Sequence, residues 1–465
     1  MTNKFNDFSG QENFDTLRKN YPFMEYVGYE AVVDPIGLHV SYEFNLAGKY
    51  TFRPGFKIPR KPFFKDFPTS ETLKTPLFDN LLFHIGLIEL ISYWKAACPQ
   101  KVFIKGHKLT KEQVLFWKTI YYQGLGEFFY TNKISTNVDD FMEIVSEGNK
   151  TDVQSIALDE TVIVPIGGGK DSVVTLEMLG EIANIRPFIM NPRGATLECT
   201  KVAGYGNDEF IEVNRRIDPL LLELNANGSL NGHTPFSAML AFYSLLVSAI
   251  SGHRHVALSN ESSANEPTVA GTEVNHQYSK SFAFESDFRR YVRGYISADF
   301  NYFSFLRPLN ELQIARLFAK QEKYFPVFKS CNAGSKTDIW CCNCPKCLFA
   351  FTILSPFIPI DNLTRIFGKN LFELPQMLTF LKELTGIAEV KPFECVGTID
   401  EVNAALQLAI SLNNGNKLPL LLEYYNNSGI FTPGNLVLPN KVLGEFNESN
   451  FLEKNFLEIL KQKLK

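Results

Sequence analysis

The sequence of 465 residues lacks the features that would place it in a membrane or on nucleic acid. No apolar stretch approaches the ~18 uninterrupted residues that a membrane-spanning helix requires, and residues 1–10 are too polar for a secretory signal. Lys and Arg never form a long run, and the formal net charge is −4, so we expect no basic surface for nucleic acid. These absences predict a cytoplasmic protein that neither enters a membrane nor binds nucleic acid.

Cysteine is also scarce: eight residues are too few for a disulfide scaffold in a chain of this length. Five of the eight nevertheless fall between Cys331 and Cys347. A C-x9-C-x2-C-x2-C spacing within this stretch is typical of a chain that wraps a tetrahedral metal ion, and it leaves Cys342 as a spare thiol. Four thiolates leave no coordination position for water, so we expect a structural metal; zinc and an iron–sulfur cluster both suit such ligands. The expected ligands are Cys331, Cys341, Cys344 and Cys347.

The distribution of apolar residues predicts an α/β protein in three parts. Residues 1–155 are expected to form an N-terminal α+β domain, with strands and turns in the first 75 residues and helices after them. Residues 156–325 alternate short apolar runs with helical periods, as in a doubly wound parallel sheet whose strand ends collect ligands. Residues 326–465 contain the cysteine cluster and a helical region.

Individual elements are expected from the same patterns. Two amphipathic helices and a polar linker are predicted at 77–97, 111–129 and 132–159. A helix, a strand, a helix and a strand follow at 173–185, 187–190, 235–251 and 255–259. Further helical segments are predicted at 371–384 and 402–412.

A glycine-rich turn, Gly167-Gly-Gly-Lys-Asp-Ser172, joins an apolar run to a helix, where backbone N–H groups bind anions. It is not a Walker loop, since Val164 replaces the first glycine of that motif and Asp171 follows the lysine. The turn resembles the Ser-Gly-Gly-x-Asp-Ser loop of the ATP pyrophosphatases, with Ile166 in place of the first serine. The resemblance implies that this turn binds ATP and that AMP passes to a substrate oxygen. Lys170 would supply a point charge, and Asp171 a helix cap or a magnesium contact. The residues expected to bind ATP are Gly167, Gly168, Gly169, Lys170, Asp171 and Ser172.

Polar segments after the turn add groups that move protons or hold a substrate. Asn231-Gly-His233 precedes a helix, 259–263 follows a strand, and 274–281 adds a histidine and a lysine. Any one of them is more often a satisfied polar residue, but together they predict a site. Arg289 and Arg293 are four residues apart on one helix face, which suits a carboxylate, a phosphate or solvent equally well.

The full set of motifs resembles the family of UDP-N-acetylmuramoyl-L-alanyl-L-glutamate epimerases of peptidoglycan precursor synthesis. The resemblance covers the chain from about Leu77 to Gly397 and rests on these segments: Ser92-Tyr-Trp-Lys-Ala96, Gly124-Leu-Gly-Glu-Phe-Phe-Tyr130, Pro165-Ile-Gly-Gly-Gly-Lys-Asp-Ser172, Asn231-Gly-His233, Asn260-Glu261, Glu273-Val-Asn-His276, Ser279-Lys280, Phe303-Ser-x-Leu-Arg-Pro308, Ser330-Cys331, Trp340-Cys-x-x-Cys-Pro-Lys-Cys347, Phe367-Gly-x-Asn370 and Lys391-Pro-Phe-Glu-Cys-Val-Gly397.

This resemblance implies an isomerase that uses ATP and Mg²⁺ and carries structural zinc. The enzyme would adenylate a carboxylate of UDP-MurNAc-L-Ala-L-Glu, exchange the glutamate Cα proton and release the D-glutamyl product with AMP and pyrophosphate. A general base needs a tunable pKa and reach to Cα, and both one-base and two-base inversion fit the sequence. The candidates for proton transfer are His233, His276, Lys280, Glu261 and Cys395, with the histidines first; those for substrate binding are Asn260, Arg289 and Arg293.

Three other functions share part of the pattern. A 7-cyano-7-deazaguanine synthase has the same loop and a similar cysteine knuckle, but it would leave the long N-terminal region unexplained. A tRNA-thiolating enzyme would need a basic surface, which the charge balance does not supply. A zinc-stabilised nucleotide-binding regulator would bind ATP without ever releasing pyrophosphate.

Overall fold

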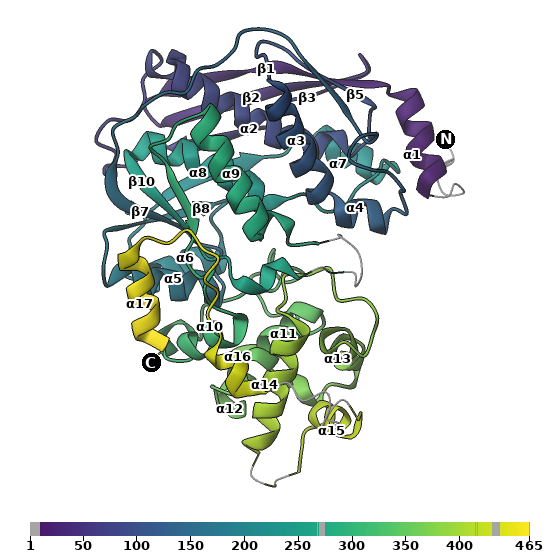
Figure 1. Ribbon diagram of the computed structural model, residues 1–465, viewed down its shortest axis with the longest axis vertical. Coiled ribbons are helices and arrows are strands. Elements are labelled where there is room, and N and C mark those ends of the chain that lie inside the picture. The colour runs from purple at the N-terminus through teal and green to yellow at the C-terminus, as the bar shows by residue number, and fades with distance from the viewer. Residues whose placement is uncertain are drawn as a thin grey trace. The chain divides into compact units, whose positions relative to one another are not determined.

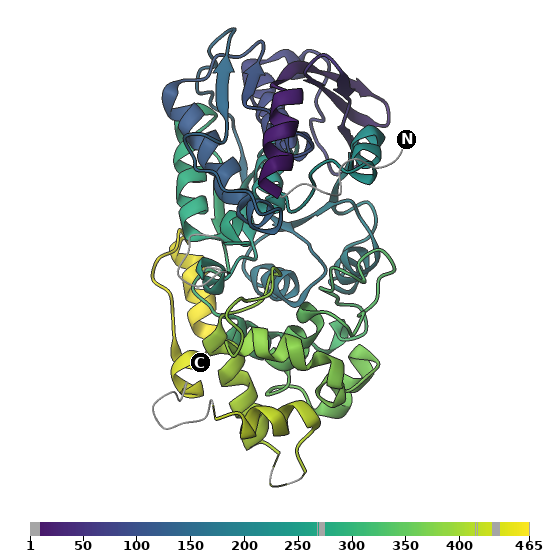
Figure 2. The same cartoon turned by 90° about the vertical axis from the view of Figure 1, so that its right-hand side faces the viewer.

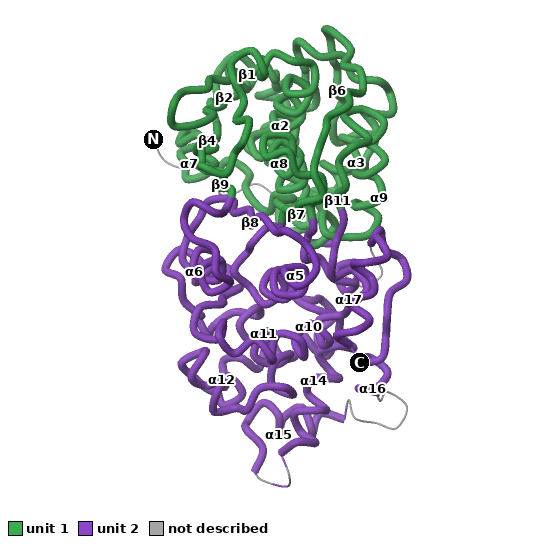
Figure 3. The backbone as a smooth tube through the Cα atoms, turned by 90° about the vertical axis from the view of Figure 1, so that its left-hand side faces the viewer, with its two compact units in different colours: residues 1–163, 211–256, 277–302 green, residues 164–210, 257–276, 303–465 purple. Residues whose placement is uncertain are grey.

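The computed structural model describes residues 10–266, 268, 275–413, 415, 417–429 and 438–464. The chain forms two compact units, each assembled from separate stretches of sequence (Figure 3). Unit 1 comprises residues 1–163, 211–256 and 277–302, and unit 2 comprises residues 164–210, 257–276 and 303–465. The three consecutive domains expected from the sequence remain a prediction.

Unit 1 contains a mixed sheet in the order β9-β4-β2-β1-β5-β6, with β3 beside β2. The pairs from β1 to β9 are antiparallel, whereas β5 pairs in parallel with both β1 and β6. β2 buries every second residue from Leu38 to Leu46, the period of a strand with one face in the core. The bounds are β1 (Phe23–Asp34), β2 (Gly37–Leu46), β3 (Tyr50–Phe52), β4 (Gly55–Pro59), β5 (Lys101–Ile104), β6 (Glu143–Ser146) and β9 (Ile211–Arg216).

The helices of unit 1 include one that is central to its core. In α2 (Pro76–Trp94) seventeen of nineteen residues are buried, so the prediction of an amphipathic helix at 77–97 is wrong. Its polar residues are paired inside the unit: the Glu89 carboxylate accepts hydrogen bonds from Arg215 at 2.6 Å and from Tyr243 at 2.9 Å. The other helices are α1 (Gly10–Asn20), α3 (Lys111–Gly124), α4 (Gly126–Thr131), α7 (Pro219–Ala226), α8 (Phe236–Ser251) and α9 (Phe282–Tyr295), with 3-10 turns η1 (Thr72–Lys74) and η3 (Tyr278–Lys280).

Two further expectations for the N-terminal region are wrong. The first 75 residues contain α1 as well as strands and turns, and this helix buries only Phe14 and Leu17. Two apolar residues on an otherwise polar segment give too weak a period to indicate a helix. The predicted polar linker contains the strand β6. Its pairing with β5 cannot be predicted from the four residues of β6 alone.

Three strands cross the division between the units: β7 (Asp159–Pro165), β10 (His253–Leu258) and β11 (Asn301–Ser304). Within unit 1, β7 and β10 pair in parallel, with Val256 opposite Ile163. Within unit 2, the Ile166 N–H donates to the carbonyl of Phe188 in β8 (Ile185–Met190) at 2.8 Å. The predicted succession of strand, helix and strand after residue 160 is therefore confirmed.

In unit 2 the helices between residues 345 and 427 gather at one end of the unit, whereas the last helix, Lys454–Leu464, lies beside the helix Lys170–Gly180 (Figure 1 and Figure 2). The predicted helical segment 371–384 consists of two 3-10 turns and one α-helix, because Pro375 interrupts it. The bounds are α5 (Lys170–Gly180), α6 (Gly194–Val202), α10 (Glu311–Phe318), α11 (Pro345–Leu354), α12 (Ile360–Phe367), α13 (Leu378–Thr385), α14 (Ile399–Ser411), α15 (Leu420–Asn427), α16 (Pro439–Gly444) and α17 (Lys454–Leu464), with 3-10 turns η2 (Ser262–Asn265), η4 (Glu322–Tyr324), η5 (Leu371–Glu373) and η6 (Pro375–Met377).

Within the ranges given above, no helix combines the length and the apolar character needed to cross a bilayer.

Candidate active site

The glycine-rich turn lies in unit 2 where the sequence predicts it, between β7 and α5. Gly168 has a φ of 81°, in the left-handed region that favours glycine. A Cβ atom at Gly168 would lie 2.9 Å from Ala195, at the start of α6. The turn is therefore packed closely against a second helix start, and only glycine fits at position 168.

The segment leading into the cysteine cluster also contacts this turn. The Lys329 N–H donates to the Gly168 carbonyl at 2.8 Å, and a Cβ atom at Gly169 would lie 3.2 Å from the Ser330 Cβ. The Ser172 hydroxyl donates to the Gly169 carbonyl at 3.0 Å, which fixes the first turn of α5. The structure thus brings the predicted phosphate turn and the predicted metal segment together within one unit.

Lys170 is buried, and two carboxylates hold its ammonium group. Its Nζ contacts the side chains of Asp171 and Glu311. Burial opposes the charge, but these carboxylates raise the pKa of Lys170 above its ordinary value. In this structure Lys170 is the centre of an ion-pair cluster, and its role as a charge for ATP phosphates stays a prediction.

Glu311 and Glu401 are buried carboxylates that the sequence analysis did not single out. Glu311 is the first residue of α10, where an acid ordinarily complements the helix dipole, so its burial could not be predicted from its position in the sequence. Glu401 forms the capping box of α14 with Thr398, a pattern that can be read from the sequence. Its contacts with other segments cannot be read from the sequence. The Glu401 carboxylate also accepts hydrogen bonds from Ser263 Oγ at 2.5 Å and from the Glu311 N–H at 3.0 Å.

Replacement of Glu311 by alanine tests whether the Lys170 cluster stabilises unit 2. In this variant the buried Lys170 ammonium keeps only the Asp171 carboxylate. Removing one partner of a buried ion pair lowers the free energy of unfolding by about 3 kcal/mol. We expect a clear drop in the midpoint of urea unfolding. Glu458→Ala breaks an exposed pair with Lys454, worth less than about 1 kcal/mol, and is the control. Equal midpoints for the two variants would contradict the assignment.

Asn260 and Glu261 follow β10 and are buried in unit 2. The Asn260 side chain donates to Ser304 Oγ at 3.1 Å, and the Glu261 carbonyl accepts from Arg307 at 2.6 Å. Burial raises the pKa of Glu311, and the nearby charges of Asp171 and Glu261 add to this effect, whereas the Lys170 ammonium opposes it. Both predicted residues therefore lie at the end of a strand, as expected.

Cys395 is half-buried in the segment 391–397, whose residues form hydrogen bonds with each other and with a neighbour of the cysteine cluster. The Lys391 ammonium donates to the Gly397 carbonyl at 3.0 Å. The Glu394 side chain accepts a hydrogen bond from Asn332, the neighbour of Cys331. Cys395 thus belongs to the same unit as the turn and the metal segment.

The four predicted metal ligands come together. Their sulfur atoms all lie within 4.8 Å of one another, and the Sγ–Sγ distances are 3.8 Å for Cys331–Cys344 and 3.7 Å for Cys341–Cys347. Backbone N–H groups donate to three of the sulfurs, at Cys331, Cys341 and Cys344. These donors favour thiolates over thiols, which is what a metal site requires.

Cys342 is the spare thiol, as predicted. Its backbone φ is 52°, and its Sγ contacts the carbonyl of Phe367 at 3.1 Å. It belongs to no group of potential metal ligands among the residues that the structure describes.

Two of the candidate proton-transfer residues, His233 and Lys280, lie in unit 1. The His233 Nδ1 is 3.4 Å from a carboxylate oxygen of Glu127, a residue that the sequence analysis did not single out. Lys280 ends the 3-10 turn η3 and is half-buried. His276 lies in unit 2, where its N–H donates to Thr268 Oγ1 at 3.0 Å. Two residues of its motif, Glu273 and Val274, lie outside the described residues.

Arg289 and Arg293 lie on α9 in unit 1, but their surroundings differ. Arg289 donates to the Asn301 side chain at 2.9 Å and to the carbonyl of Tyr302, whereas Arg293 is exposed. Their predicted role in substrate binding therefore stays a prediction for both.

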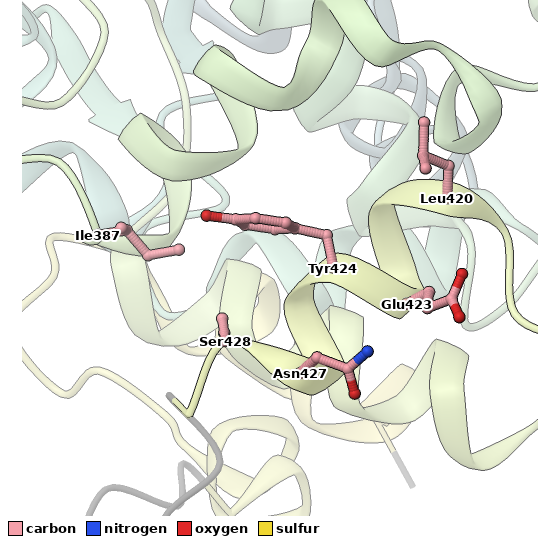
Figure 4. Close-up of a pocket in the computed structure, with 6 residues that line it drawn as sticks. All are labelled: Ile387, Leu420, Glu423, Tyr424, Asn427 and Ser428. Atoms are coloured by element: carbon pink, nitrogen blue, oxygen red, sulfur yellow. The ribbon is translucent and has the colours of Figure 1, made fainter.

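A pocket of about 560 Å³ lies in the helical region of unit 2 (Figure 4). Tyr424 of α15 points across it toward Ile387. None of the lining residues is one of the predicted site residues; they are Ile387, Leu420, Glu423, Tyr424, Asn427 and Ser428.

Comparison with known proteins covers both units. A family model for the MurL N-terminal domain matches residues 16–305, and one for the MurL C-terminal domain matches residues 327–429. Three relatives share the name UDP-N-acetyl-alpha-D-muramoyl-L-alanyl-L-glutamate epimerase. The protein of Salinispora tropica is 34% identical over 79% of this chain and 83% of its own length. The protein of Micromonospora sp. is 32% identical over 79% of this chain and 85% of its own length. The protein of Xanthomonas oryzae pv. oryzae is 36% identical over 70% of this chain and 74% of its own length. The chain therefore belongs to the MurL family of UDP-N-acetylmuramoyl-L-alanyl-L-glutamate epimerases, as its motifs predict.

Proposed function

We propose that this protein is an ATP-dependent epimerase that converts the terminal L-glutamate of UDP-MurNAc-L-Ala-L-Glu to D-glutamate in peptidoglycan precursor synthesis. The observation that carries the proposal is its likeness to three epimerases of that name over most of their length. The glycine-rich turn between a buried strand and a helix supports the use of ATP.

The reaction needs a means of making the glutamate Cα–H acidic. Removing that proton beside a free carboxylate would place negative charge next to an anion. Transfer of AMP to the carboxylate removes this charge, so the proton can leave to give an enolate-like intermediate. Reprotonation on the opposite face and hydrolysis then give the D-glutamyl product, AMP and pyrophosphate.

In this proposal the turn of unit 2 carries out the adenylation. Gly167, Gly168 and Gly169 bring backbone N–H groups to the start of α5, and Ser172 holds that first turn in shape. Mg²⁺ would shield the triphosphate, and Asp171 is the carboxylate of the turn that suits it. The order β7, turn, α5 and β8 supports a doubly wound sheet of the ATP pyrophosphatase type.

Proton transfer falls to groups with a tunable pKa. The candidates remain His233, His276, Lys280, Glu261 and Cys395, with Asn260, Arg289 and Arg293 as candidates for substrate binding. The burial of Glu261 and the carboxylate beside His233 support the choice of these two residues.

The cysteine cluster suits a structural zinc ion. Four sulfurs around a zinc ion at ~2.3 Å lie ~3.8 Å apart in a tetrahedron. The observed separations of 3.7 and 3.8 Å match that geometry. In an iron–sulfur cluster the four thiolates are divided among two or more iron atoms, so sulfurs bound to different irons lie farther apart. All four sulfurs here lie within 4.8 Å of one another, which favours a single ion. Zinc here would fix the chain segment that contacts the phosphate turn. Reduced thiolates of this kind fit the cytoplasm, where we place the reaction.

A stereochemical assay tests the proposed function directly. The protein is incubated with Mg²⁺ and UDP-MurNAc-L-Ala-L-Glu, with and without ATP, and the glutamate is released by hydrolysis. With ATP, we expect D-glutamate to accumulate together with equimolar AMP, because each inversion consumes one adenylation. Without ATP, the glutamate should remain in the L form.

Other outcomes of this assay point to other functions. Inversion in the absence of ATP would contradict carboxylate adenylation. AMP formation only with ammonia and a carboxydeazaguanine would indicate a 7-cyano-7-deazaguanine synthase. ATP binding with no release of pyrophosphate under any condition would indicate a nucleotide-binding regulator.

A further inference from the structure

Three motifs of unit 1 that are far apart in sequence meet around His233. They contribute Lys95 after α2, Glu127 in α4, and the turn 231–234 before α8. The adenylation chemistry of unit 2 does not account for any of them.

Lys95 fixes the backbone of the turn that carries His233. Its Nζ donates to the carbonyl of His233 at 3.2 Å, to Thr234 Oγ1 at 2.6 Å and to the carbonyl of Gly232. Lys95 is buried, and burial lowers its pKa to about 8. A buried lysine with three neutral acceptors on one turn restrains that turn strongly, because any other conformation would leave the ammonium poorly solvated.

Packing against the α3–α4 region also restrains this turn. A Cβ atom at Gly124 would lie 2.7 Å from the Pro235 ring, so glycine permits the close approach of the turn. The Asn132 side chain donates to the Asn231 carbonyl at 3.1 Å. Both contacts come from the α3–α4 region, which also carries Glu127.

Glu127 places its carboxylate against one nitrogen of the His233 ring. The Nδ1–Oε2 distance is 3.4 Å, and the side chains are 21% and 18% exposed for His233 and Glu127. A carboxylate on Nδ1 sets the ring orientation and the tautomer and stabilises the imidazolium, so that protons are exchanged at Nε2.

We propose that Glu127 is the positioning residue for His233, and that this pair, held by Lys95, exchanges the substrate Cα proton. The inference rests on the proposed function. The Cα–H bond of the adenylated glutamyl group breaks, an N–H bond forms at Nε2, and the electron pair moves into the neighbouring carbonyl. The Glu127 carboxylate faces the imidazolium that results and stabilises it.

Glu127→Gln separates this role from adenylation. Glutamine keeps the shape of the side chain but removes its charge. We expect exchange of the α-proton with solvent deuterium to fall about 100-fold, in the range that a general base contributes. Substrate-dependent exchange of pyrophosphate into ATP should stay within about 2-fold, because adenylation is assigned to the turn of unit 2. Glu127→Asp, which keeps the charge, should recover part of the loss.

A second histidine–carboxylate pair in unit 1 provides the matched control. Glu160 lies 2.7 Å from His255 Nε2, and Glu160→Gln removes that carboxylate without touching the His233 turn. Both exchange rates should remain at the wild-type value in Glu160→Gln. The melting temperature of each variant checks that it is folded.

Each remaining outcome overturns the inference. Wild-type deuterium exchange in Glu127→Gln would show that His233 works without this carboxylate or does not act. Parallel loss of both exchange reactions would show that Glu127 only supports the fold. Absence of pyrophosphate exchange in the wild-type protein would instead overturn the proposed function, and this assignment with it.

Discussion

Cys344→Ser is expected to abolish the proposed zinc binding and to unfold the part of unit 2 that contains the cluster. Cys344 is buried, its sulfur lies 3.8 Å from that of Cys331, and it also caps the N-terminus of α11. Zinc binding at a structural site contributes on the order of 10 kcal/mol to folding. The free energy of unfolding of most domains is only about 5–15 kcal/mol, so a variant that cannot bind zinc loses most or all of its stability. We expect zinc content well below one equivalent and rapid proteolysis within residues 326–465.

The same change should also affect the phosphate turn. Lys329 lies two residues before the first cysteine of the cluster, and its N–H donates a hydrogen bond to the Gly168 carbonyl. When the cluster unfolds, the turn loses this contact and the packing of Ser330 on Gly169. Pyrophosphate exchange should therefore disappear together with the metal, and calorimetric titration should show no ATP binding.

Cys342→Ser is the matched control for the metal site. Its sulfur contacts the Phe367 carbonyl, and a serine hydroxyl can donate to the same oxygen. This variant should retain one equivalent of zinc and wild-type pyrophosphate exchange. A full equivalent of zinc in Cys344→Ser, or equal loss from both variants, would contradict the assignment of ligands.

The parts of the site that the sequence predicted are those whose chemistry is local. The glycine turn and the cysteine spacing lie within short segments, so strand, turn, helix and ligand geometry follow from consecutive residues. His233 could be singled out for the same reason, since it sits beside Gly232 at the start of a helix.

The partners of those residues could not be predicted, because they come from distant parts of the chain. Glu311 is 141 positions from the lysine that it contacts, and Lys95 is 138 positions from His233. An acid at the first position of a helix and a lysine at the end of an apolar helix are both ordinary surface patterns. Their burial depends on contacts with distant segments, so it cannot be predicted from neighbouring residues.

The fold shows the same division. The strand, turn and helix of the central part were predicted from local periodicity, whereas α2 was wrongly expected to be amphipathic. Its buried Glu89 looks like a residue of a solvated face until Arg215 and Tyr243 are seen to pair with it. The assembly of each unit from separate stretches of chain likewise has no local signature.

Gly168→Ala should lower the rate of adenylation about 100-fold without unfolding the protein. A Cβ atom would lie 2.9 Å from the Ala195 backbone carbon and 3.0 Å from the Thr196 nitrogen, and neither backbone atom can yield without moving α6. The φ of 81° adds about 1–3 kcal/mol of strain for a residue other than glycine. Displacement of the turn by ~1 Å would lower the rate of AMP transfer about 100-fold, since phosphate contacts require exact placement.

Two further glycines separate this steric effect from a general effect of alanine. Gly180, at the end of α5, has open space around it, so Gly180→Ala should leave pyrophosphate exchange and the melting temperature unchanged. Gly167→Ala adds a methyl that meets no atom within 4 Å, so it should lose less activity than Gly168→Ala, although it lies in the same turn. If Gly167→Ala loses as much activity as Gly168→Ala, packing on α6 is not what holds the turn in its active shape. If Gly168→Ala adenylates its substrate at the wild-type rate, the turn does not bind the phosphates of ATP.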